Sequence, residues 1–79
     1  KRANKEHLEL LEYGKIASPK EIDDHQLHIN EHTCFMLGEE YERAVNKNPK
    51  LEKIMLEHIR THKQFIEITK NYLKEEANE

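Results

Sequence analysis

The residues best suited to chemistry in this chain are histidines, and four of the six stand in a repeated pattern. The first copy runs His28-Ile29-x-x-His32-x-x-Phe35 and the second runs His58-Ile59-x-x-His62-x-x-Phe65, thirty residues later. Two histidines four residues apart lie on one face of a helix, where imidazoles can chelate a metal ion. Imidazole rings can also exchange hydrogen bonds or titrate near neutral pH. The repeat therefore predicts two matching helices whose histidine faces meet.

Three interpretations of these histidines remain open from the residues alone. The rings can pack and hydrogen-bond in a helix seam, with Asp24, Glu31 or Glu57 as nearby acceptors. They can face a pH-sensitive interface. They can bind zinc or another divalent metal through four candidate ligands, namely His25, His28, His58 and His62.

The first interpretation is the one we adopt, because the stronger metal patterns His-Glu-x-x-His and Glu-x-x-His are missing from these helices. The sequence predicts no catalytic residue and no cofactor, and Cys34 falls off the histidine stripe as a small filler. The predicted packing and interface residues are Ile29, His32, Phe35, Met36, Met55, Ile59, Phe65 and Ile66.

Composition limits the classes of function. The chain has 79 residues with a net charge of −3, which argues against the basic surface of a nucleic-acid-binding protein. No apolar run approaches the ~20 residues of a membrane span. A single cysteine forms no internal disulfide or thiolate zinc site and indicates a reducing compartment. Because the sequence begins at Lys1, we expect a single helical domain excised from a larger protein.

Helix signals divide the chain into four segments. Residues 3–14 predict a first helix with Leu8, Leu11 and Tyr13 on its inner side, ended by Gly14. Ser18-Pro19-Lys20-Glu21 resembles a capping box and predicts a second helix over 19–37.

The second half of the chain predicts one short helix and one long one. Residues 40–46 form the short helix, and Asn48-Pro49 starts the long helix over 49–75. The fold class is therefore all-α, an antiparallel hairpin of two long helices with a shorter N-terminal helix. A register that places residue 37 opposite residue 49 brings His28 level with His58, His25 level with residue 61 and close to His62, and His32 near Met55. The apolar stripe is wider than two helices need, so we expect oligomerisation to complete a small bundle.

One stretch resembles a known family. The residues Asp23-Asp24-His25-x-x-His28-Ile29-x-x-His32-x-x-Phe35, Asn48-Pro49-x-Leu51 and Leu56-x-His58-Ile59-x-x-His62 resemble the C-terminal helical segment of tailed-bacteriophage portal (connector) proteins. The resemblance covers roughly residues 19–66.

The resemblance implies a structural role and no enzymatic activity. It implies part of the portal at a vertex of the phage head, assembled in the host cytoplasm, through which DNA is packaged. The segment would act by self-association or by binding other head proteins, without contacting a membrane or specific DNA sequences. The alternatives are a small histidine-rich metal-binding module and a non-viral helical adaptor.

Overall fold

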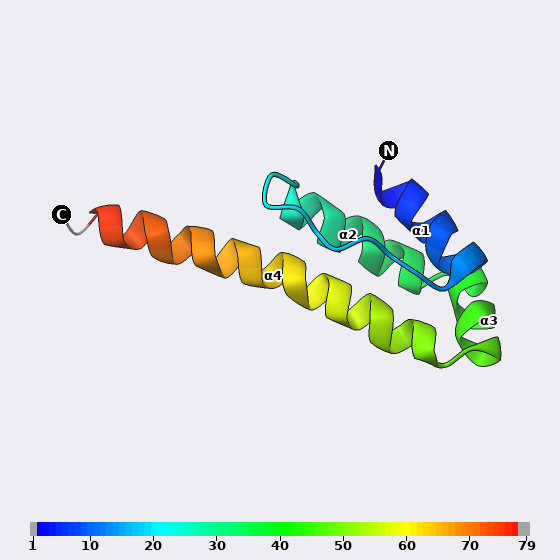
Figure 1. The fold of residues 1–79 in the computed structure, drawn as a ribbon. Coiled ribbons are helices and arrows are strands. Elements are labelled where there is room, and N and C mark those ends of the chain that lie inside the picture. The colour runs from blue at the N-terminus through cyan, green and yellow to red at the C-terminus, as the bar shows by residue number, and fades with distance from the viewer. Residues whose placement is uncertain (1, 78–79) are drawn as a thin grey trace.

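The computed structural model describes residues 2–77, with side chains described to residue 74. It contains α1 (Arg2–Tyr13), α2 (His25–Met36), α3 (Glu39–Lys47) and α4 (Lys50–Ala77), shown in Figure 1. The described residues contain no strand, and the predicted all-α class is confirmed. No described helix is both long and apolar enough to cross a membrane.

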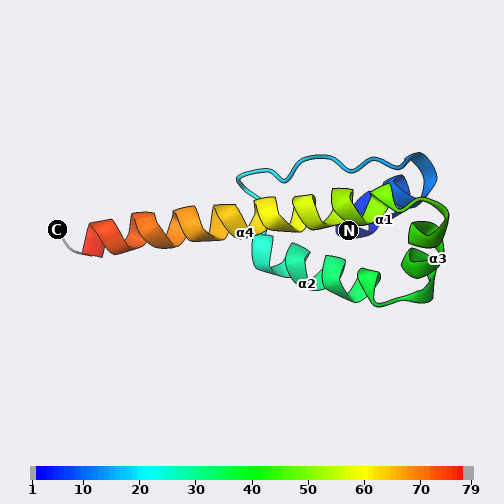
Figure 2. The same ribbon diagram turned by 90° about the horizontal axis from the view of Figure 1, so that it is seen from below.

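The framework is a hairpin of α2 and α4, which run antiparallel with α3 as the corner between them (Figures 1 and 2). α1 lies against α2, on the part of the hairpin nearest the corner. The linker of residues 14–24 then runs back along α4 to the start of α2 (Figure 2). This path brings three helices together around the repeated histidines.

The predicted start of α2 is wrong by six residues. Residues 19–24 lie outside the helix, and Ile22 is 91% exposed. The cap is Asp24, whose carboxylate accepts a hydrogen bond from the Leu27 backbone N–H at 3.1 Å. Asp23 similarly holds a turn by accepting from the Lys20 N–H at 2.8 Å. Aspartate is a strong N-cap, and the helix starts directly after Asp24, so the predicted capping box at Ser18 is not used.

The predicted inner face of α1 is also wrong. Leu8 and Tyr13 are exposed, Leu11 is half-buried, and the residues that α1 does bury are Ala3, Glu6, His7 and Leu10. Those four follow the spacing i, i+3, i+4, i+7 of one helix face. Gly14 does end the helix as predicted, with φ of +67° and its N–H donating to the Leu10 carbonyl at 2.9 Å.

The apolar core lies where α1, α3 and α4 meet, next to the corner of the hairpin. It consists of Leu10, Tyr41, Leu51 and Met55. Among the predicted packing residues, His32, Met55 and Ile59 are buried, whereas Ile29, Phe35, Met36, Phe65 and Ile66 are half-buried. The apolar core is small, and the middle of the α2–α4 seam is filled by histidines.

The C-terminal half of α4 extends past the start of α2 without a neighbour (Figures 1 and 2). We call residues 66–77 the α4 extension. Its Ile68, Tyr72 and Leu73 are 57–63% exposed. An isolated helix of this length is marginal in water, so the extension gains stability from any surface that covers it.

Candidate metal centre

All six histidines of the chain are buried, and they form one cluster between α1, α2 and α4. Across the α2–α4 seam, the His28 and His62 ring centroids lie 4.9 Å apart and those of His32 and His58 lie 4.8 Å apart. The predicted register is therefore wrong by one helical turn: His28 lies level with His62, not with His58, and His32 lies against His58. The predicted proximity of His25 to His62 is confirmed at 5.0 Å.

A carboxylate from α1 enters this cluster. Glu6 is 3% exposed, and its Oε1 atom lies 3.4 Å from His28 Nδ1 and 3.6 Å from His32 Nε2. Its Oε2 atom lies 3.7 Å from His58 Nε2. The fourth imidazole joins through His62 Nε2, which is 3.2 Å from His58 Nε2. One carboxylate and four imidazoles thus aim donor atoms at a shared volume.

The spacing of these atoms fits metal ligands better than hydrogen bonds. The three contacts of Glu6, at 3.4–3.7 Å, exceed the usual 2.7–3.2 Å of a hydrogen bond. Ligands placed tetrahedrally at 2.0–2.1 Å around zinc lie about 3.3 Å from one another. Two sets have donor atoms within 4.8 Å of one another, His28–His32–His62 and Glu6–His32–His58, and they share His32. Each set of three donors therefore approaches the dimensions of a coordination sphere and would close around an ion through side-chain shifts.

Several of the same atoms lack any other partner. Glu6 Oε1, Glu6 Oε2, His28 Nδ1 and His32 Nε2 are buried and have no hydrogen-bond partner among the described residues. An unsatisfied buried polar group costs about 1–3 kcal/mol, and a buried carboxylate costs more. A cation bound by Glu6, His32 and His58 would give a partner to the Glu6 carboxylate and to His32 Nε2.

Two outer histidines orient the inner ones. His25 Nε2 lies 3.2 Å from the Glu21 carbonyl oxygen, which can only accept, so this nitrogen carries the proton. His25 Nδ1 is then the acceptor for His62 Nδ1–H at 2.7 Å, which leaves the Nε2 lone pair of His62 facing the site. On the other side, His7 Nε2 lies 2.7 Å from His32 Nδ1. Such partners of the second ring nitrogen fix the orientation of metal-bound histidines.

Burial keeps three of the inner imidazoles, those of His32, His58 and His62, neutral. Burial, reinforced by neighbouring histidines, lowers the pKa of His32 to about 3. Burial likewise lowers the pKa values of His58 and His62 to about 4. Burial also raises the pKa of Glu6, although the charges of His28 and Arg2 act in the opposite direction. Neutral imidazoles at physiological pH have free lone pairs, which is the state that binds a metal ion.

The structure sorts the four ligands considered from the sequence. His28, His58 and His62 contribute to the inner group, whereas His25 is an outer partner. His32, predicted as a packing residue, belongs to both donor sets. Glu6 and His7 were missed. The sequence signal for both is the helical spacing that they share with Ala3 and Leu10 on one face of α1. This face is hard to recognise because two of its four residues are polar.

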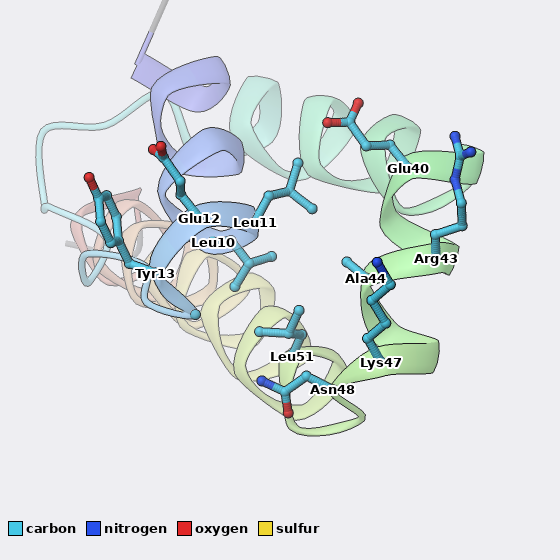
Figure 3. A pocket seen from close by; sticks show the side chains of 11 residues that line it. Leu10, Leu11, Glu12, Tyr13, Glu40, Arg43, Ala44, Lys47, Asn48 and Leu51 are labelled. Atoms are coloured by element: carbon cyan, nitrogen blue, oxygen red, sulfur yellow. The ribbon is translucent and has the colours of Figure 1, made fainter.

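The largest hollow of the described surface lies elsewhere. It measures about 700 Å³ between the end of α1, α3 and the start of α4. Figure 3 shows Leu10 and Leu11 on one side of it and Ala44 and Lys47 of α3 on the other. A smaller hollow of about 440 Å³ includes His7 and the exposed Cys34. Neither contains the inner donor atoms, so the metal candidate is a buried centre and not a surface pocket.

No protein-family model, curated protein or solved structure matches this chain. The class supported by the fold and site is therefore a small helical protein with a buried histidine–carboxylate cluster.

Proposed function

We propose that this protein binds a divalent first-row transition-metal ion between α1, α2 and α4. The observation that carries the proposal is the buried donor set of Glu6, His32 and His58, in which both Glu6 oxygens and His32 Nε2 lack a hydrogen-bond partner among the described residues. His28 and His62 form the second set with His32. Imidazole with one carboxylate suits zinc, iron, nickel or copper, and it excludes the oxygen-only environment that calcium or magnesium prefers.

Charge balance supports a single ion. In the donor set of Glu6, His32 and His58 the two imidazoles are neutral and the carboxylate is the one formal charge, so a divalent ion leaves a net +1. A second divalent ion in the same buried volume would raise this charge to +3, which burial opposes. The ion would join three helices that share only a small apolar core, and its binding free energy would add to folding stability.

The test is metal analysis of the full chain, produced without an affinity tag and dialysed against zinc. We expect about one zinc per chain and a chelator-dependent fall in melting temperature. Cobalt substitution gives a second readout, since its visible absorption bands report the number of ligands. The variant His32→Leu should lose the bound metal, and Thr33→Leu, at the exposed neighbouring position, should keep it. Metal-free protein with an unchanged melting temperature in chelator would reject the proposal.

A second candidate function is assembly, and the α4 extension is the observation that favours it. Half-buried Phe65 and Ile66 lead into the exposed Ile68, Tyr72 and Leu73, so the apolar stripe of α4 continues past α2. Between residues 63 and 76 the sequence has three lysines and three glutamates, a balance that suits antiparallel pairing with a second copy. Self-association would agree with the resemblance to portal segments, and the phage-head role itself stays a prediction.

Sedimentation across a concentration series tests assembly. Leu73→Glu should abolish self-association, whereas Leu37→Glu, at an 83% exposed position away from the extension, should leave it unchanged. A wild-type chain that stays monomeric at millimolar concentration would reject assembly through this surface.

A further inference from the structure

The helix that supplies the carboxylate, α1, packs mainly on α2. α1 is joined to α2 by the linker of residues 14–24, so it can leave the α2–α4 hairpin without breaking a helix. Of its four buried residues, only Ala3 and Leu10 are apolar. The other two, Glu6 and His7, belong to the histidine cluster. For Glu6 and His7, two of the four residues that α1 buries, docking is therefore favoured only by their contacts in the histidine cluster.

The remaining contacts of α1 are few. Leu10 is fully buried against Tyr41, Leu51 and Met55. The ring of His7 stacks on Phe35 at 4.1 Å. Arg2 pairs with Asp23, in the turn that precedes α2.

On the side facing α3, the hollow of Figure 3 separates Leu11 from Ala44 and Lys47. Leu8 and Tyr13 face solvent. The apolar contribution to docking therefore comes mainly from Leu10, with smaller parts from Ala3 and the half-buried Leu11.

Docking α1 carries a specific cost. It moves the Glu6 carboxylate from water to a site where it is 3% exposed and neither oxygen has a hydrogen-bond partner among the described residues. Two of the imidazoles that face it, those of His32 and His58, are neutral and offset a negative charge poorly. A divalent ion held by the α2 and α4 histidines reverses this balance, because the same carboxylate then becomes its anionic ligand.

We propose that the metal ion is a clamp that controls whether α1 is docked. This inference rests on the proposed metal site. With metal bound, Glu6 ties α1 to the α2–α4 hairpin and Leu10 covers the core. Without metal, α1 detaches and uncovers an apolar surface formed by Tyr41, Leu51 and Met55. The site would then couple metal availability to the exposure of a binding surface.

Hydrogen exchange on the full chain, with zinc and with chelator, tests the clamp. Backbone amides of residues 6–13 should exchange at least tenfold faster in chelator, while those of residues 55–62 on α4 keep most of their protection. Glu6→Gln should make exchange in α1 independent of zinc, since a neutral amide gains nothing from the ion. Glu12→Gln, at an exposed position of the same helix, should behave like the wild type.

The outcomes separate the two proposals. Absence of zinc binding would reject both the metal site and the clamp. Zinc binding with unchanged exchange in α1 would reject the clamp alone. Equal loss of protection in α1 and α4 on chelation would also reject the clamp, because the ion would then hold the whole bundle and not one helix.

Discussion

His25 and His62 share a 2.7 Å contact between their Nδ1 atoms, and this contact determines which nitrogen of His62 faces the site. The Glu21 carbonyl accepts from His25 Nε2 and so makes His25 Nδ1 an acceptor. His62 must then donate from Nδ1 and keep Nε2 unprotonated. The Glu21 backbone carbonyl in the linker therefore determines, through His25, which ring nitrogen of His62 carries the proton.

His25→Phe tests this orienting role. The phenyl ring preserves the stacking with Phe65, where the centroids lie 4.8 Å apart, but removes the acceptor for His62. We expect zinc affinity to fall about 10–100-fold with stoichiometry unchanged. This is the usual effect of removing a group that hydrogen-bonds the other ring nitrogen of a metal-bound histidine. Isothermal titration calorimetry measures both quantities. Unchanged affinity in a folded variant would show that His62 needs no orienting partner.

His32→Leu should destabilise the protein much more with zinc than without it. His32 is fully buried and shared by both donor sets, so its loss should abolish tight zinc binding. In chelator, the loss of stability should be much smaller than with zinc, because removal of the unpartnered Nε2 offsets the broken contact between His32 Nδ1 and His7 Nε2. Urea unfolding with and without zinc separates the two effects. A variant destabilised equally in both conditions would mean that His32 is a packing residue.

Stability of the metal-free protein should fall as the pH is lowered. The folded pKa values of His32, His58 and His62 lie at about 3–4, below the ordinary value of 6.5. The unfolded chain therefore binds more protons below pH 6.5, and the stability present above that pH is lost between about pH 6.5 and 4. Each such histidine contributes a slope of about 1.4 kcal/mol per pH unit.

The contribution of Glu6 to the pH dependence of stability has the opposite sign to that of the histidines. Its pKa is raised in the folded state, so its protonated form favours folding and partly offsets the loss near the acidic end of the range. Urea unfolding of the wild type at pH 7, 6, 5 and 4 in chelator measures the profile. Equal stability at pH 7 and pH 5 would contradict buried neutral histidines.

The small core should depend strongly on Met55. Met55 is fully buried between α1, α3 and α4, and its neighbour Leu56 is 48% exposed. Met55→Ala should destabilise the protein by about 2–5 kcal/mol through lost burial and the cavity left behind. Leu56→Ala, a similar truncation on the same helix turn, should cost less than about 1 kcal/mol. Thermal and urea unfolding of the two variants provide the comparison.

The parts of the fold that the sequence predicts well are those fixed by local signals. Asn48 and Pro49 place the start of α4 within one residue, and Gly14 ends α1 through a left-handed conformation that glycine adopts readily. The start of α2 was harder because Ser18 and Asp24 both qualify as caps. Asp24 is chosen since Asp23 and Lys20 close a turn just before it.

The site could be predicted only in part because it depends on tertiary placement. Spacing identified the histidine pairs, but the seam register is set by packing at the α3 corner and differs from the expected one by a turn. Glu6 was missed because α1 buries a mixed polar and apolar face. Leu8 was predicted to be buried but is exposed, so the inner face was assigned to the wrong side of α1. A carboxylate that enters from a third helix leaves no pattern in the two histidine helices.

Gathering every imidazole of the chain in one cluster gives the protein an internal spectroscopic reporter. In a histidine-labelled sample, the chemical shifts of all six rings report on the same small region between α1, α2 and α4. Binding of a metal ion should shift them together, whereas self-association through the α4 extension should leave most of them unmoved. Nuclear magnetic resonance of six side chains can thus follow the centre and the extension independently in a single titration.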